Sequence, residues 1–308
     1  MLRDTAGANT LTWYHFKSAD DAELDALASK LHLHPLHMED ARSAGERVKV
    51  EGSSTYVFAL LKTLTLVQGA EDPVLETICI FASHAEEAGE KPGQADPFFI
   101  VIADTDKVQV AAALRRAQEE CSSAPPPRLL YLIFDSIVDS YFPAIDALDD
   151  EIDALEDRVI SPAPDLLSEI FAVKRQLVDI RRLLVSTRDA SMHLQRDGGL
   201  PLDSPHQLYL RDLYDHISRL LDTVETQRDL LNNALDIYLS SIANRTNEVV
   251  KVLTVLSTIA LPALVVTGVY GMNIKGLPFV DSKYAVEWVA TLTLSLTGGL
   301  LVLMRWLG

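Results

Sequence analysis

One helical face between residues 236 and 271 carries the side chains best suited to handling ions. Reading back from Gly271 in steps of three and four residues gives a stripe of small or polar side chains with only two leucine levels. Small and hydroxyl residues let membrane helices pack closely. The same residues can also line a channel, with leucine rings as constrictions and polar rings as hydrated stations. Periodicity alone leaves both interpretations open. The stripe consists of Asp236, Ser240, Ala243, Asn247, Val250, Thr254, Ser257, Leu261, Leu264, Gly268 and Gly271.

A single long helix is predicted to carry this stripe and to finish inside a membrane. It begins at Ser204 and Pro205, a pairing of helix cap and first-turn proline, and no glycine or proline follows before Pro262. Residues 252–272 are 21 consecutive uncharged positions, enough to cross a hydrocarbon core of about 30 Å. A second uncharged stretch, 288–304, is flanked by tryptophans suited to the membrane interface. Two transmembrane helices are therefore expected.

The outer end of the long helix reads Tyr270-Gly271-Met272-Asn273. This motif resembles the CorA family of divalent-cation channels, as do the run 244–254, which contains Asn-Arg-Thr-Asn, and Pro262. The hallmark of that family is Gly-Met-Asn at the outer end of the first of two transmembrane helices. The resemblance is clearest over residues 129–274. It implies a CorA-like funnel: an α/β cytosolic domain, a very long stalk helix and two transmembrane helices, assembled as a homopentamer in the lipid bilayer.

The same resemblance assigns the ion path. Gly271, Met272 and Asn273 would form the selectivity filter, with the asparagine side-chain carbonyls accepting hydrogen bonds from a hydrated ion. Magnesium sheds its water reluctantly, so neutral oxygens suit it. Leucines would narrow the path, and an aspartate would form a charged ring at its cytoplasmic end. The expected pore-lining residues are Asp236, Asn247, Val250, Leu253, Thr254, Ser257, Leu261, Leu264 and Gly268.

Many carboxylates crowd the helix expected over residues 129–160. Most are interpreted as the solvated face of a helical hairpin, although like charges this close also favour a bridging divalent cation. In the CorA family, carboxylates at subunit contacts bind intracellular Mg²⁺ and hold the channel shut, and Asp135 and Asp212 match them. No carboxylate occupies the matching N-terminal stretch, for which Glu71 or Asp72 would stand in.

The chain is expected to fall into segments in the order that such a channel requires. Strands are predicted over residues 11–16, 55–66, 76–82 and 98–103, and helices over 20–31 and 108–121. The expected segments are an α/β domain (1–127), an acidic antiparallel helical hairpin (128–200), the cytosolic stalk (203–251), the first transmembrane helix (252–273), an outer loop (274–287) and the second transmembrane helix (288–307).

Charge and composition narrow the partners. The net charge is −17, and residues 249–308 contribute +2, so residues 1–248 carry −19. This acidity argues against nucleic acid as a partner and suits cations. Two distant cysteines indicate a reducing compartment. The polar start lacks a signal peptide, so both termini are expected in the cytoplasm and the spans in a bacterial inner membrane. His32, His34 and His37 lack a fourth ligand, so packing is favoured over metal binding there.

The predicted function is uptake of Mg²⁺, and also of Co²⁺ or Ni²⁺, through a channel gated by intracellular Mg²⁺. No catalytic constellation is visible, so an enzyme is not expected. The alternative is proton-coupled Zn²⁺ transport, because Lys275 and the Gly-Leu-Pro sequence that follows it resemble the zinc-transporting branch of the family. A two-span membrane sensor is a more distant alternative, and the short outer loop argues against it.

Overall fold

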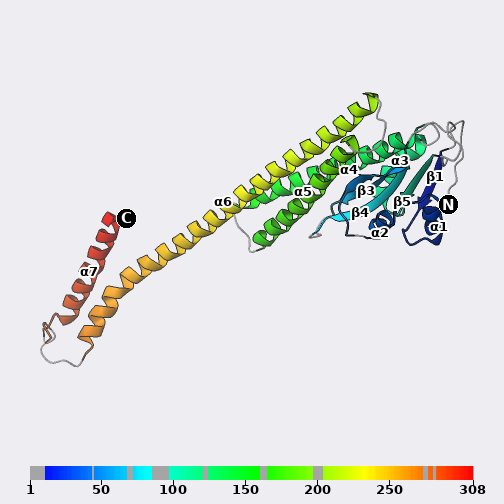
Figure 1. Cartoon of the computed structure of the whole chain (residues 1–308). Helices are drawn as coiled ribbons and strands as arrows, with labels where there is room; N and C mark the ends of the chain where they lie inside the picture. Colours follow the sequence, from blue (N-terminus) through cyan, green and yellow to red (C-terminus); the bar gives the residue numbers. More distant parts are fainter. Residues whose placement is uncertain are drawn as a thin grey trace. The chain divides into compact units, whose positions relative to one another are not determined.

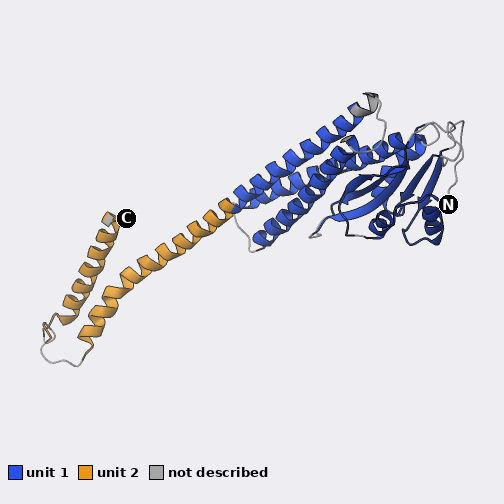
Figure 2. Cartoon of the chain, in the orientation of Figure 1, with its two compact units in different colours: residues 1–235 blue, residues 236–308 orange. Residues whose placement is uncertain are grey.

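The structure is a computed structural model that describes residues 11–43, 45–67, 72–84, 97–120, 124–159, 165–196, 204–272, 277–279 and 282–307. The chain divides into two compact units, residues 1–235 and 236–308 (Figure 2). Several predictions fall outside the described residues. These concern Asn273, the loop residues 274–276, Glu71, Cys121 and the proline break at 161–164.

A five-stranded mixed sheet forms the centre of the first unit, in the order β1-β5-β4-β3-β2 (Figure 1). The outer strand β1 pairs in parallel with β5, and the other neighbours are antiparallel. The strands are β1 (Thr12–Phe16), β2 (Lys49–Gly52), β3 (Tyr56–Thr65), β4 (Val74–Ser83) and β5 (Phe98–Ile102). Four of them confirm predicted strands. Strand β2 was not predicted, because its four residues include two charged side chains and a glycine and bury only Val50.

Helices cover both faces of this sheet. The side chains of Tyr56, Phe58 and Leu60 on β3 pack in one core cluster with residues of α1 (Ala22–Lys30) and α2 (Pro35–Arg42). The opposite face lies against α3 (Val108–Glu120) and α4 (Pro126–Val159). Side chains alternate across a strand, so coverage of both faces explains why every residue from 56 to 61 is at most 1% exposed. The predicted α/β class is confirmed.

Long helices complete the first unit. Helix α5 (Leu166–Arg196) follows α4, and α6 (Ser204–Tyr270) begins in this unit. Polar contacts supplement the apolar packing: the amide of Gln227 on α6 donates to the carbonyl of Ile145 on α4 at 3.0 Å, and Lys174 on α5 donates to Asn232 on α6 at 3.1 Å. From residue 146 onward the carboxylates of α4 are exposed or half-buried, as expected for a solvated face.

The second unit contains the rest of α6 and helix α7 (Ala285–Leu307). Both helices are long and apolar enough to cross a membrane. They contact one another within this unit, where the hydroxyl of Thr258 on α6 lies 3.2 Å from the sulfur of Met304 on α7. The predicted architecture of a long helix followed by a second membrane-length helix is confirmed.

Candidate ion path and cytosolic metal-ligating cluster

Helix α6 presents two contrasting faces in the second unit. Pro262 and Val266 are buried and Thr258 is half-buried, which marks the face that packs on α7. An α-helix turns about 100° per residue, so Ser257 and Leu264 lie on roughly the opposite side, and the other stripe residues lie between this side and the packed face. The second membrane-length helix therefore covers the back of the stripe and leaves its front uncovered. All nine predicted pore-lining residues are exposed: Asp236, Asn247, Val250, Leu253, Thr254, Ser257, Leu261, Leu264 and Gly268.

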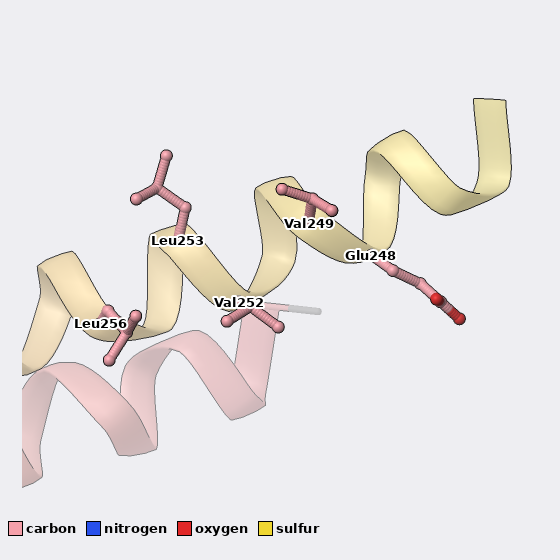
Figure 3. A pocket seen from close by; sticks show the side chains of 5 residues that line it. All are labelled: Glu248, Val249, Val252, Leu253 and Leu256. Carbon is pink, nitrogen blue, oxygen red and sulfur yellow. The ribbon is translucent and has the colours of Figure 1, made fainter. Parts of the chain in front are cut away.

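A shallow depression near residue 250 separates these two faces (Figure 3). In this view Val249 and Leu253 project from the side of α6 away from the neighbouring ribbon of α7, whereas Val252 and Leu256 project toward it. Leu253 thus lies on the side of α6 that faces away from α7, as expected for a residue that narrows the ion path. Glu248 adds a carboxylate at the polar end of the depression.

Threonine hydroxyl groups of the membrane-length segment donate hydrogen bonds to carbonyls of their own helix. Thr254 donates to the carbonyl of Val250 at 2.8 Å, and Thr267 donates to that of Ala263 at 2.6 Å. This back-bonding satisfies the hydroxyl proton inside an apolar environment. Because a hydroxyl oxygen also accepts hydrogen bonds, Thr254 on the exposed stripe can still accept one from the water around an ion.

The end of α6 explains why glycine occupies residue 271. Its backbone nitrogen donates to the carbonyl of Thr267 at 2.8 Å. A Cβ atom added there would lie 2.9 Å from that same carbonyl oxygen, closer than real Cβ contacts allow. Met272 donates to the carbonyl of Val269 at 3.3 Å and is exposed. The backbone therefore turns tightly off the helix at the predicted filter, whose Asn273 lies outside the described residues.

Two contacts attach the outer loop to the ends of both helices. The hydroxyl of Tyr270 on α6 donates to the carbonyl of Pro278 at 3.3 Å. The ring of Phe279 stacks on Trp288 of α7, with centroids 5.0 Å apart and an interplanar angle of 17°. Phe279 adopts a φ of 69°, a left-handed conformation that is uncommon outside glycine. Sequence reasoning assigned Trp288 to the membrane interface and missed its stacking partner.

The two predicted regulatory carboxylates lie in the first unit, in different surroundings. Asp135 on α4 is buried, and its Oδ2 accepts a hydrogen bond from Arg116 of α3 at 3.0 Å. The side chain of Asp212 on α6 is 60% exposed. His216 follows Asp212 one helical turn later, with its Nε2 3.8 Å from Asp212 Oδ1 and its Nδ1 4.0 Å from Asp139 Oδ1.

The structure thereby gathers a set of metal-ligating side chains that sequence reasoning did not assemble. Asp135, Asp139 and His216 each offer one ligand atom, and these atoms all lie within 4.8 Å of one another. Among the described residues this is the group of three His, Cys, Asp or Glu side chains close enough to hold an ion. A signal was present in the sequence: residues 135 and 139, like 212 and 216, are four apart and share a helix face.

The electrostatics of this cluster reflect crowded, partly desolvated charge. Burial raises the pKa of Asp139, and the neighbouring negative charge of Asp135 raises it further. Burial together with the charge of Asp135 also raises the pKa of the Tyr131 phenol, which keeps this side chain neutral. The cluster therefore has excess negative charge that a cation would relieve.

Two of the three histidines near residue 34 make hydrogen bonds within the fold. His32 takes a left-handed φ of 54° just after α1. The Nδ1 of His34 accepts from the backbone of Leu36 at the start of α2. His37 is buried, 2.9 Å from the Tyr56 hydroxyl and 3.0 Å from a Glu51 oxygen. Packing, favoured from the sequence over metal binding, describes His37, whereas His32 and His34 are exposed.

Comparisons with known proteins agree across the chain. The family described as CorA-like Mg²⁺ transporter protein matches residues 8–305. The cobalt/magnesium transport protein CorA of Thermotoga maritima is 31% identical over 299 residues, which cover 96% of this chain and 82% of that protein. The putative metal ion transporter YfjQ of Bacillus subtilis is 28% identical over 294 residues, covering 94% and 87%.

Two solved structures share the fold. The complete CorA magnesium transporter from Methanocaldococcus jannaschii superimposes with a TM-score of 0.76 at 22% identity, covering 97% of this chain and 90% of that one. The ZntB cytoplasmic domain from Vibrio parahaemolyticus gives a TM-score of 0.58 at 14% identity, covering 76% and 88%. Similarity to both shows the fold and leaves the transported ion open.

Proposed function

The chain belongs to the family of CorA-like Mg²⁺ transporters, and from this premise we propose that it is a channel for Mg²⁺, and also for Co²⁺ and Ni²⁺, in a bacterial inner membrane. Both termini lie in the cytoplasm, and five copies surround one path lined by α6. The relative from Thermotoga maritima is named for cobalt and magnesium transport, which supports this choice of ions. As an ion transporter the protein needs no catalytic group.

The observation that carries this proposal is the uncovered polar stripe of α6. Within the charge-free segment, Ser257 lies on the face away from α7, and Thr254 is exposed beside the face that packs on α7. A polar face turned toward lipid is unfavourable, because hydrocarbon offers no hydrogen-bond partners. Copies of α6 arranged around a common axis would turn this face toward a water-filled path, and α7 would face the lipid.

The chemistry of the stripe suits an ion that keeps its hydration shell. Neutral oxygens of Thr254, Ser257 and Asn273 would accept hydrogen bonds from metal-bound water, while Leu253 and Leu261 would narrow the path. Mg²⁺ usually keeps several waters in proteins. The membrane potential drives uptake with about 2.3 kcal/mol per charge per 100 mV, so about 4.6 kcal/mol for a divalent ion.

Gating would use the cytosolic carboxylates. Asp212 is exposed enough to reach an ion at a contact between copies. Asp135 has one oxygen engaged by Arg116 and would ligate through the other. Bound Mg²⁺ would stabilise the closed state, provided that it binds this state more tightly than the open one.

Transport of Zn²⁺ coupled to protons is the second candidate. It is favoured by Lys275 and the Gly-Leu-Pro sequence that follows it in the outer loop, which resemble the zinc-transporting branch of the family. In this case the same path would carry Zn²⁺, and flux would depend on a pH gradient.

Flux into proteoliposomes separates these candidates. We expect Mg²⁺, Co²⁺ and Ni²⁺ to enter along an imposed potential whether or not a pH gradient is present, and Asn273→Ala to abolish selective flux. Zn²⁺ entry that requires a pH gradient, without Mg²⁺ entry, would establish the alternative. Unaltered flux and selectivity in Asn273→Ala would remove the filter assignment.

A further inference from the structure

Helices α6 and α7 enclose a groove at the end of α6 that leads to the predicted filter. Thr267 and Tyr270 line it on α6, and residues between 285 and 294 line it on α7. We propose that this groove binds one acyl chain of a phospholipid of the phosphatidylethanolamine class, whose headgroup lies at Lys283 and Glu287. The binding requires that both helices cross a membrane; only the exclusion of a second copy as occupant rests on the proposed function.

The dimensions of the groove match one leaflet of a membrane. Its volume is about 640 Å³, within the range of about 300–1,000 Å³ that is typical of small-molecule sites. Along α7 it extends from Ala285 to Leu294, which is about 13.5 Å at 1.5 Å per residue. One leaflet contributes half of a hydrocarbon core of about 30 Å. An acyl chain lying along the groove therefore stays within a single leaflet.

Short side chains on α7 leave this space open. Ala285 and Ala290 line the groove, and alanine carries no side-chain atom beyond Cβ. The lining residue Val286 is 80% exposed, so the groove opens to the surroundings of the helix pair. For two membrane-spanning helices, these surroundings are lipid.

The polar atoms of the lining already have partners, which suits an apolar occupant. The hydroxyl of Thr267 donates to the carbonyl of Ala263 at 2.6 Å, and that of Thr293 donates to the carbonyl of Val289 at 2.8 Å. Burying a hydroxyl under an acyl chain is unfavourable unless the hydroxyl is hydrogen-bonded. Both threonines meet this condition, so a lipid chain can cover them without leaving a donor unpaired.

The groove lies on the side of α6 away from the proposed ion path. Tyr270 follows the stripe residue Gly268 by two positions and lies about 200° around the helix from it, while Thr267 lies about 100° from it. In the proposed ring, neighbouring copies of α6 meet beside the stripe that faces the axis. The side that carries Tyr270 therefore faces outward, which favours a lipid over a second copy of the chain as the occupant.

The charges at the mouth of the groove complement a zwitterionic headgroup. Lys283 and Glu287 flank the first lining residues of α7, and both are exposed. Neither forms an ion pair with another residue in the part of the chain that the structure describes. A lysine donates to a phosphate, and a glutamate accepts from a primary ammonium. Phosphatidylethanolamine carries both groups, whereas phosphatidylglycerol has no ammonium and the quaternary ammonium of phosphatidylcholine has no N–H to donate.

Aromatic side chains place this mouth at the level of the headgroups. Trp288 stacks on Phe279 with centroids 5.0 Å apart, and the Tyr270 hydroxyl donates to the carbonyl of Pro278 at 3.3 Å. Tryptophan and tyrosine are enriched at the membrane–water interface. The bound lipid would therefore fill the space between α7 and the end of α6, directly before the predicted filter.

The test is native mass spectrometry of the full-length protein in detergent after removal of co-purified lipid. Dioleoyl phosphatidylethanolamine, phosphatidylglycerol and phosphatidylcholine are added separately at equal concentration. We expect phosphatidylethanolamine to be retained at a single molecule per chain and in excess over the other two. Ala290→Trp fills the groove and should abolish this retention. Val302→Trp is the matched control, because it adds the same side chain at an exposed position of α7 outside the groove, and it should retain lipid as the wild type does.

Two charge variants test the headgroup assignment. Lys283→Gln should weaken phosphatidylethanolamine binding about two- to fivefold, as expected for an exposed charge pair. Glu287→Gln should weaken it by a similar factor and should strengthen phosphatidylglycerol binding, because a repelling carboxylate is removed. Equal retention of these two lipids by the wild type, or unchanged retention of both in Glu287→Gln, would overturn the headgroup assignment.

A wild-type oligomer that retains no lipid, as expected if a second copy covers the groove, would overturn the site. Unchanged retention in Ala290→Trp would do the same. Circular dichroism establishes that each variant is folded; if Ala290→Trp unfolds, Ala285→Leu decides, because it narrows the mouth and should reduce retention, whereas unchanged retention refutes the site. Ion flux is measured separately in liposomes, so a protein that retains the lipid but transports no divalent cation refutes the proposed function and leaves the lipid site intact.

Discussion

Replacing Gly271 with alanine tests whether the tight end of α6 is required for ion passage. The new methyl carbon would lie 2.9 Å from the carbonyl oxygen of Thr267, about half an ångström inside an ordinary contact. The obstructing atom belongs to the helix backbone, so the last turn itself must shift. Overpacking of this kind costs about 1–3 kcal/mol, which reduces the population of the native helix end by a factor of about 5 to 150.

The assay is Mg²⁺ entry into proteoliposomes, with protein incorporation measured in parallel. Flux in Gly271→Ala should fall by a factor within that range. Gly299→Ala is the matched control, because nothing lies within 4 Å of the added Cβ at that glycine of α7, and alanine is the better helix former. Its flux should equal that of the wild type. Full flux in Gly271→Ala, with normal incorporation, would refute the steric reasoning.

Three further predictions concern the two units separately. Burial lowers the pKa of His37 below its ordinary value of 6.5, so the unfolded chain takes up the proton first and the stability of the folded protein should fall as pH drops below about 6.5. Denaturation midpoints of wild type and His37→Gln, measured between pH 7.5 and 5.5, should converge at the acid end. Parallel curves would contradict this. Phe58→Ala removes a ring with 0% exposure and should lower the free energy of unfolding by about 3–5 kcal/mol in chemical denaturation. Val67→Ala, at an exposed site, should lower it by less than about 0.5 kcal/mol. Similar midpoints for the two variants would argue against the core assignment. Phe279→Ala removes the ring stacked on Trp288, a contact worth about 0.5–1.5 kcal/mol. The rate of proteolysis in the outer loop should therefore rise by a factor of about 2 to 12. An unchanged rate would show that the stacking does not restrain the loop.

The parts of the fold that were predictable are those in which local pattern and burial agree. The long apolar run from Tyr56 is typical of a strand whose two faces are both covered. Helix α6 is predictable because no glycine or proline interrupts its helical pattern before Pro262. Helix α2 is not among the helices predicted for this domain, although His34 caps it and Pro35 occupies its first position. Its short length and charged residues weaken the apolar period that marks longer helices.

The metal-ligating cluster was only partly predictable for a different reason. The helical spacing between Asp135 and Asp139 is visible in the sequence, as is that between Asp212 and His216. The approach of one pair to the other depends on how α4 packs against α6, which is a tertiary property. The burial of Asp135 against Arg116 likewise arises from a tertiary contact, between the consecutive helices α3 and α4.

Pro262 makes α6 easier to bend at one position within its membrane-length segment. A proline nitrogen carries no hydrogen, so the carbonyl of Thr258, one turn earlier, cannot receive its usual helical bond. The helix therefore bends most easily between these two residues. Leu261 and Leu264 lie next to this position on the uncovered face. In the proposed channel, a slight bend there would move Leu261 and widen the path at its level without unwinding a turn.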